Sequence, residues 1–220
     1  MKRKLQRFAE IEEFVHVLQP KMGYPPVDQP VKGKWHREFF KNHHPIVLEL
    51  GCGRGEYTVE LAEKYPQNNF IGIDIKGARL WRGSKTAHEN NMTHVGFIRT
   101  EIQWIEHFFA AGEVNEIWIT FPDPHVRNSK AEKRLTSNSF LKKYAAVIAP
   151  GGFIHLKTDN EALYNFTLET LHEHKYLIHA STNDLYQSPL LNDELGIKTT
   201  YEKIFTDKGF KICYIKFSIS

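Results

Sequence analysis

Short apolar runs alternate with longer amphipathic stretches from residue 46 onward. Seven runs have the length and composition of strands: residues 46–50, 70–75, 94–99, 116–121, 152–157, 176–180 and 211–217. Five segments between them have helical patterns: residues 55–65, 76–90, 102–110, 137–148 and 160–174. Strands that alternate with helices are typical of βαβ units, so the pattern predicts an α/β fold with a seven-stranded, mostly parallel sheet and helices on both faces.

Residues 1–44 have a different character. Apolar residues recur at helical spacing between Phe8 and Leu18, and a proline-rich stretch follows at residues 20–30. This pattern predicts a helix followed by an irregular arm. We therefore expect two parts, a basic N-terminal arm over residues 1–44 and a globular domain over residues 45–220.

Composition narrows the class of protein. Of the 220 residues, 41% are hydrophobic and 25% are charged, as in ordinary soluble domains. No apolar run approaches the ~18 residues of a membrane span, and the basic start at Lys2 leads into charged residues where a secretion signal has an apolar segment. We expect a cytoplasmic protein without a membrane partner. Cys52 and Cys213 are the only cysteines, and the 12 histidines lack metal-ligand spacing, so we expect neither a disulfide framework nor a metal site.

Basic residues are concentrated in two windows. Residues 1–44 carry nine Lys and Arg against five Asp and Glu, and residues 127–143 carry six against Glu132 alone. The formal net charge of the chain is only +3, so the remaining segments are acidic. A basic surface on an acidic body is typical of proteins that bind a phosphate-rich partner, although each window alone also fits a solvated helix face.

A glycine-rich turn follows the first strand predicted in the domain. Gly51, Gly53 and Gly55 alternate with single residues, and Glu49 precedes them at the strand end. Strand, turn and helix form the layout of a Rossmann-like nucleotide site, but Glu56 stands where a pyrophosphate-binding loop has its third glycine. The turn instead suits an uncharged nucleoside with an amino-acid tail, such as S-adenosylmethionine, whose ammonium group can pair with Glu49. A tight turn without a ligand also fits this motif taken alone.

Acidic residues follow the next strands in turn. Asp74 lies where a carboxylate accepts hydrogen bonds from ribose hydroxyls, although it also suits the N-cap of the helix predicted from Lys76. Glu101 follows the third strand and suits either the adenine amine or an exposed first turn. Asp123 lies between two prolines after the fourth strand, where the fixed φ angles of proline hold the carboxylate beside the expected methyl donor, or simply in a rigid loop. Together these acids predict a cofactor site at the carboxyl edge of the sheet.

Several motifs resemble those of the bacterial tRNA (guanine-N7-)-methyltransferase family. They are Glu49-Leu-Gly-Cys-Gly-Arg-Gly55, Phe121-Pro-Asp-Pro124, Lys133-Arg-Leu135, Lys157-Thr-Asp-Asn160 and Thr199-Thr-Tyr-Glu202, and the match spans about residues 32–217. The resemblance implies a Rossmann-like class I methyltransferase fold. It also implies transfer of the methyl group of S-adenosylmethionine to N7 of a guanosine in the variable loop of tRNA.

The same resemblance implies roles for particular residues. The cofactor site would be lined by Glu49, Gly51, Gly53, Gly55, Asp74, Glu101 and Asp123, with Asp123 also at the reaction centre. The substrate site would be formed by Arg127, Asp159, Thr199, Thr200, Tyr201 and Glu202. Two residues depart from the usual family pattern, since Arg127 stands where Lys is common and Glu101 where Asp or Asn is common.

The expected chemistry needs little proton transfer. Guanine N7 carries an in-plane lone pair and no proton, so its methylation requires no obligatory general base, and the sequence shows no Ser/His/Asp or Cys/His arrangement. A fixed carboxylate such as Asp123 or Asp159 can stabilise the positive charge that develops on the base.

Three alternatives use the same features. A small-molecule methyltransferase would share the glycine turn and the acids, but it would not need the basic window at residues 127–143. An amino-group nucleic-acid methyltransferase would have adjacent prolines after the fourth strand, whereas Asp123 separates them here. A non-catalytic RNA-binding module would be expected to lose its cofactor residues, and Glu49, Asp74 and Asp123 are all present.

Overall fold

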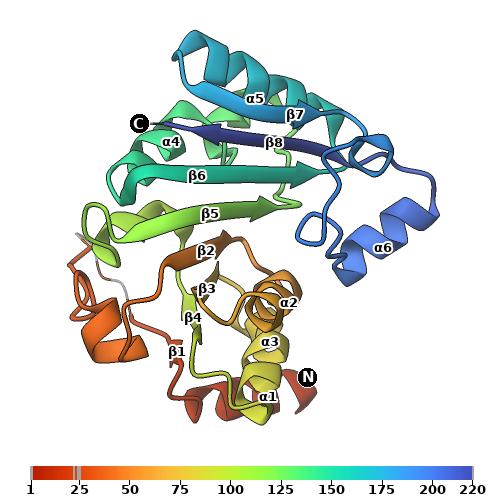
Figure 1. Cartoon of the computed structure of the whole chain (residues 1–220). Coiled ribbons are helices and arrows are strands. Elements are labelled where there is room, and N and C mark those ends of the chain that lie inside the picture. Colours follow the sequence, from red (N-terminus) through yellow and green to blue (C-terminus); the bar gives the residue numbers. More distant parts are fainter. Residues whose placement is uncertain (1, 22, 24–25, 220) are drawn as a thin grey trace.

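The computed structural model describes residues 2–21, 23 and 26–219, and these form a single sheet in the order β1-β4-β3-β2-β5-β6-β8-β7 (Figure 1). The strands are β1 (Val17–Leu18), β2 (Ile46–Leu50), β3 (Asn69–Asp74), β4 (Val95–Arg99), β5 (Val114–Thr120), β6 (Ile148–Thr158), β7 (Leu177–Thr182) and β8 (Cys213–Ser218). All neighbours are parallel except β8, which runs antiparallel to both β6 and β7. The mixed α/β fold predicted from the sequence is confirmed.

Helices connect the strands and cover both faces of the sheet. They are the α-helices α1 (Lys2–Glu12), α2 (Glu56–Lys64), α3 (Gly77–Glu89), α4 (Asn138–Ala145), α5 (Glu161–Glu173) and α6 (Thr200–Asp207), with shorter turns η1 (Trp35–Phe40), η2 (Ile102–His107), η3 (Asn128–Lys133) and η4 (Leu185–Gln187). Side chains alternate along β2, so Leu48 packs into one apolar cluster with Leu141 and Leu163, and Val47 packs into a second cluster with Leu80. The sheet therefore separates two buried cores.

Several elements differ from the sequence-based expectation. All seven predicted strands are present with small shifts at their ends, but the sheet has an eighth strand, β1, in which Val17 pairs with Phe97 and Leu18 with Ile98. The segment predicted as a helix over 102–110 is the 3₁₀ turn η2, and Ile148 begins β6 instead of ending a helix. Helix α6 was not expected. It has only eight residues, its apolar residues Tyr201 and Ile204 are exposed, and its buried residue is Glu202.

The N-terminal arm packs closely against the sheet and α3. Trp35 is fully buried, its Nε1 donates to Phe108 O at 2.9 Å and its ring stacks on Phe109 at 5.2 Å. Trp35 is therefore a packing residue and is not available to stack on an RNA base. Glu10 binds Lys85 at 2.8 Å and accepts from Trp81 Nε1 at 2.7 Å, which attaches α1 to α3.

Candidate active site

The glycine turn joins β2 to α2 through left-handed backbone. Gly51, Gly53 and Gly55 have φ angles of 74°, 56° and 68°, which residues with a Cβ adopt at a cost. Gly51 N donates to Ile73 O at 2.8 Å, so the turn is fastened to the end of β3. A Cβ on Gly55 would lie 2.6 Å from the Phe97 ring, whereas one on Gly53 would meet only Gly51 O at 3.9 Å. Gly55 thus permits close packing, and Gly53 leaves open space above the turn.

Asp74 is fixed at the floor of a cleft by two backbone amides. Its Oδ2 accepts from Gly53 N at 3.0 Å and its Oδ1 accepts from Lys76 N at 2.7 Å, while the residue is only 9% exposed. The second bond resembles the capping role that the sequence also allowed, but the first ties the carboxylate to the glycine turn. Asp74 therefore lies where the carboxyl ends of β2 and β3 meet.

Glu49 is buried beside the same turn. Its carboxylate accepts hydrogen bonds from Thr58 N at 2.9 Å, from Thr58 Oγ1, and from Thr120 Oγ1 at 2.5 Å. Burial raises the pKa of Glu49 to about 7 even though these donors oppose the shift. The carboxyl group is thus held rigidly and is easily protonated near neutral pH.

Two connected cavities run along the carboxyl edge. The larger one, of about 740 Å³, is lined by Asp74, Glu101 and Asp123, among others. The smaller one, of about 330 Å³, is lined by Glu49 and by the glycine turn, and the two share Gly51, Arg79 and Phe121 as lining residues. The structure therefore brings the four sequence-predicted acids to one continuous cleft.

Two neighbouring polar residues of the larger cavity have fewer hydrogen-bond partners than Glu49 has in the smaller cavity. Glu101 is exposed and accepts from Gln103 Nε2. Thr100 lies next to it at the wall of the larger cavity, is 6% exposed, and its Oγ1 has no hydrogen-bond partner among the described residues. An unpaired buried hydroxyl is costly, so this position favours a polar ligand group in the cleft.

The loop that carries Asp123 begins and ends in strained backbone. Phe121 and His125 have φ angles of 48° and 40°, and neither is glycine. The Asp123 side chain is 73% exposed, and its Oδ1 accepts from His125 N at 3.0 Å. The loop therefore places the carboxylate at the wall of the larger cavity, with one backbone amide bound to it.

Arg134 holds this loop from behind. It is only 7% exposed, its Nε donates to Pro124 O at 3.1 Å, its Nη2 donates to His125 O at 3.2 Å, and its guanidinium lies 4.2 Å from the centre of the Phe166 ring. The sequence placed Arg134 in a basic surface window, and that is wrong for this residue. No local pattern distinguishes it from Lys130 and Lys133, which are exposed.

Two of the sequence-predicted substrate residues lie on the start of α6 and reach the rest of the site. Thr200 donates from N and Oγ1 to the Glu56 carboxylate at 2.7 and 2.8 Å, and Tyr201 OH donates to Asp159 Oδ2 at 3.3 Å. Burial and the Asp159 carboxylate raise the pKa of Tyr201 to about 12, so its hydroxyl remains a donor. These contacts bring the segment from Thr199 onward beside the smaller cavity.

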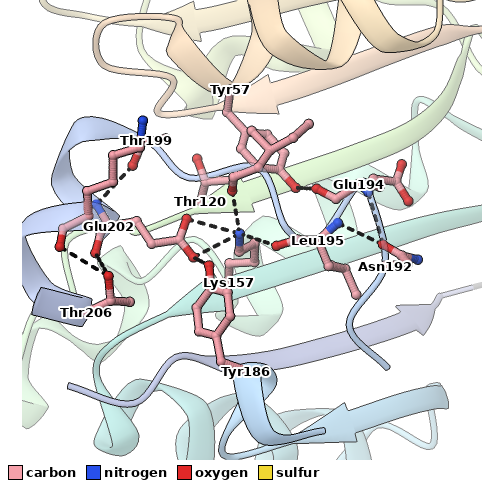
Figure 2. Close-up of polar contacts among 12 residues, drawn as sticks. Tyr57, Thr120, Lys157, Tyr186, Asn192, Glu194, Leu195, Thr199, Glu202 and Thr206 are labelled. Carbon is pink, nitrogen blue, oxygen red and sulfur yellow. Dashed lines mark hydrogen bonds and ion pairs between the residues drawn. The ribbon is translucent and has the colours of Figure 1, made fainter. Parts of the chain in front are cut away.

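Glu202 behaves differently from its neighbours. Glu202 and Lys157 are both fully buried, with Glu202 Oε1 3.0 Å from Lys157 Nζ (Figure 2). Lys157 Nζ also donates to Leu195 O at 2.9 Å and to Ile197 O at 3.0 Å, while Tyr186 OH donates to Glu202 at 2.6 Å. The Glu202 side chain therefore faces the interior, away from any substrate, and its contact with Lys157 is a feature that sequence spacing did not reveal.

Arg127 lies outside this arrangement. It is exposed, precedes η3, and its side chain makes no hydrogen bond or ion pair with the residues that the structure describes. The described residues also contain no group of three His, Cys, Asp or Glu placed to hold a metal ion. None of their helices is long and apolar enough to cross a membrane.

The chain is similar to known methyltransferases over most of its length. A family model described as "Putative methyltransferase" matches residues 43–215. A tRNA (guanine-N(7)-)-methyltransferase of Christiangramia forsetii is 50% identical over 99% of this chain and 98% of its own length. One from Bacteroides thetaiotaomicron is 48% identical over 99% of this chain and 86% of its own length.

The fold has solved relatives of low sequence identity. The crystal structure of the 16S rRNA methyltransferase KamB superimposes with a TM-score of 0.65 at 14% identity and covers 88% of this chain and 94% of its own. This likeness supports the fold, and the sequence relatives are similar over nearly the whole chain. The chain therefore belongs to the tRNA (guanine-N(7)-)-methyltransferase family.

Proposed function

We propose that this protein transfers the methyl group of S-adenosylmethionine to N7 of a guanosine in the variable loop of tRNA. The observation that carries the proposal is the single cleft in which the glycine turn, Asp74 and Glu101 meet the Asp123 loop and the start of α6. Relatives with nearly 50% identity bear the corresponding name. The site of action is the cytoplasm, and the catalytic domain is residues 45–220, to which the N-terminal arm adds strand β1.

The residues present fit the cofactor. The unpaired Thr100 Oγ1 and the Glu101 carboxylate offer a donor and an acceptor near the adenine end, and Asp74 retains lone pairs for ribose hydroxyls. Gly53 leaves room for close approach of the backbone, and Glu49 lies at the far end of the cleft for an ammonium group. S-adenosylmethionine supplies a methyl group activated by its sulfonium centre.

The protein contributes position and charge to the reaction. The lone pair of guanine N7 attacks without loss of a proton, so no side chain must act as a base. The base gains positive charge during the transfer, and the Asp123 carboxylate, bound by the amide of His125, stabilises that charge. Asp159 and Tyr201 shape the substrate side of the cleft, Arg127 contacts tRNA from the exposed rim, and Glu202 positions α6 through Lys157.

The direct test is product analysis. Unmodified tRNA transcript is incubated with the protein and S-adenosylmethionine, digested to nucleosides and separated with N7-methylguanosine and N2-methylguanosine standards. We expect N7-methylguanosine, mapped to the variable loop by fragment mass spectrometry. Methylation at an exocyclic amine, or methylation of small molecules only, would contradict the proposed function. Binding of tRNA without turnover would favour a non-catalytic module instead.

A further inference from the structure

A row of aromatic rings leads from the cleft along the outer surface of α6. Phe121, which lines both cavities, lies 5.4 Å from the ring of Tyr201. Tyr201 stacks on Phe205 with the ring centres 4.3 Å apart, and Phe205 meets Phe210 edge-on at 5.3 Å. The row therefore joins the reacting site to a surface that the sequence motifs do not include.

Two of the rings in this aromatic row are open to solvent. Tyr201 is 44% exposed and Phe210 is 51% exposed, while Phe205 is half-buried between them. The rings of Phe210 and Phe205 meet at an interplanar angle of 67°, so they do not stack face to face, and 51% of Phe210 is open to solvent. Exposed aromatic rings next to a functional cleft mark an interaction surface more often than isolated apolar residues do.

Lysines and acidic residues both lie around the aromatic row. Lys208 Nζ lies 5.4 Å from the centre of the Phe205 ring, and Lys203 is exposed on the same segment, as is Asp207. Lys211 is also exposed but pairs with Asp184 at 3.2 Å, so Lys203 and Lys208 are the lysines of this segment for which the structure describes no ion pair. Aromatic rings interleaved with lysines suit a partner that offers both flat π faces and negative charge. A nucleic acid offers both, whereas an apolar protein partner would leave these ammonium groups desolvated.

The position of Phe210 in the fold places it on the substrate side. Phe210 lies three residues before β8, whose first residue, Cys213, pairs with Thr158 beside Asp159. In Figure 1, α6 lies beyond the tips of β5 and β6, at the carboxyl edge of the sheet. The row therefore begins at the cleft that a target guanosine would enter and extends away from it on the side of Asp159.

We propose that Phe210, supported by Phe205, stacks on a nucleobase of tRNA that is unpaired near the target guanosine. This inference rests on the proposed function, because it assigns a second contact to the same substrate. Single-stranded bases stack on aromatic side chains without strict sequence preference, and variable loops present unstacked bases. Phe210 would then hold the RNA while Asp123 faces the reacting base.

The test measures binding of an unmodified tRNA transcript by filter retention. Phe210→Leu keeps an apolar side chain but removes the ring, and Phe210→Trp restores a larger ring. We expect Phe210→Leu to raise the Kd for tRNA by about fivefold or more and Phe210→Trp to match the parent. The affinity for S-adenosylmethionine and the salt dependence of tRNA binding should not change, because neither the cleft nor a phosphate-binding side chain is altered.

A matched control comes from the opposite edge of the sheet. Leu177 begins β7, is 61% exposed, and lies at the amino end of its strand, so Leu177→Ala should leave tRNA binding unchanged. Parent-like tRNA affinity of Phe210→Leu, in an enzyme that still forms N7-methylguanosine, would overturn this inference alone. A parent that binds no tRNA would overturn it together with the proposed function. A parent dimer in light scattering that Phe210→Leu dissociates would assign the row to a second copy of the chain and overturn it as well.

Discussion

Lys157 and Glu202 form a fully buried ion pair that connects the end of β6 to the first turn of α6, with 3.0 Å between Nζ and Oε1. Lys157 lies two residues before Asp159, and Glu202 directly follows Tyr201. The pair therefore sets the distance between the two residues whose hydroxyl and carboxylate meet at the substrate side of the cleft.

Removing one charge of this pair should destabilise the fold more than removing both charges. We expect Glu202→Gln to lower the free energy of unfolding by ~3–5 kcal/mol, because Lys157 is left as an uncompensated buried charge. Combining Glu202→Gln with Lys157→Met should recover much of this loss, since no charge then remains buried. Urea denaturation measures each variant, and Lys32→Met, which breaks a partly exposed pair with Asp28, should change the stability by less than ~1 kcal/mol. A double variant as unstable as the sum of the single ones would contradict this account.

Glu49 should make cofactor affinity depend on pH. Its pKa of about 7 means that the carboxyl group is mostly protonated at pH 6, whereas an ammonium group binds the ionised form better. Binding should therefore release a proton, and affinity for S-adenosylmethionine should rise as pH increases from about 5.5 to 7 and then level off. Calorimetry across this range tests the prediction. In Glu49→Gln the affinity should be lower and nearly independent of pH over the same window; an unchanged slope would assign the proton to another group.

The charge of Asp123 should matter more for rate than for binding. Asp123→Asn keeps an Oδ1 acceptor for His125 N but removes the negative charge that faces the methylated base, so kcat should fall by roughly 10²-fold or more. Cofactor affinity should change little. Single-turnover methylation of tRNA measures the chemical step. Glu132→Gln is the matched control, because it removes an exposed carboxylate from the same cleft and should leave kcat nearly unchanged.

Arg134 and its lysine neighbours should have separable effects. Arg134→Met removes the hydrogen bonds to Pro124 O and His125 O, so we expect a lower kcat with an unchanged salt dependence of tRNA binding. Replacement of the exposed Lys130 and Lys133 by Ala should instead weaken tRNA binding and reduce the log–log salt slope by about 0.7–0.9 for each phosphate that is no longer neutralised. The measurement is tRNA Kd between low and physiological salt. Equal slopes for all variants would show that RNA binds elsewhere on the surface.

The sequence predicted those elements whose structure depends on residues close together along the chain. The central strands are apolar on both faces, and the run from Ile46 to Leu50 is recognisable because helices cover both sides of the sheet. Strand β1 has only two residues, too few to establish a period, and its pairing depends on β4, which lies far along the chain.

The site was predictable where single carboxylates follow strands, as for Asp74, and less so where long-range contacts decide a role. The burial of Glu202 depends on Lys157, 45 residues away. Arg134 is buried through its contacts with Pro124, His125 and Phe166, whereas the adjacent Lys133 is exposed. Charge counts treat such residues alike, because a count does not distinguish a solvated ammonium from a desolvated guanidinium.

The hydrogen bonds from Thr200 to Glu56 connect the substrate side of the cleft to the cofactor side. Glu56 is the first residue of α2 and follows the glycine turn, while Thr200 begins the segment on the substrate side. Any ligand that tightens this contact on one side changes the free energy of binding on the other. Thermodynamic reciprocity then requires that RNA and the methyl donor alter each other's affinity by the same factor, so one measured coupling determines both.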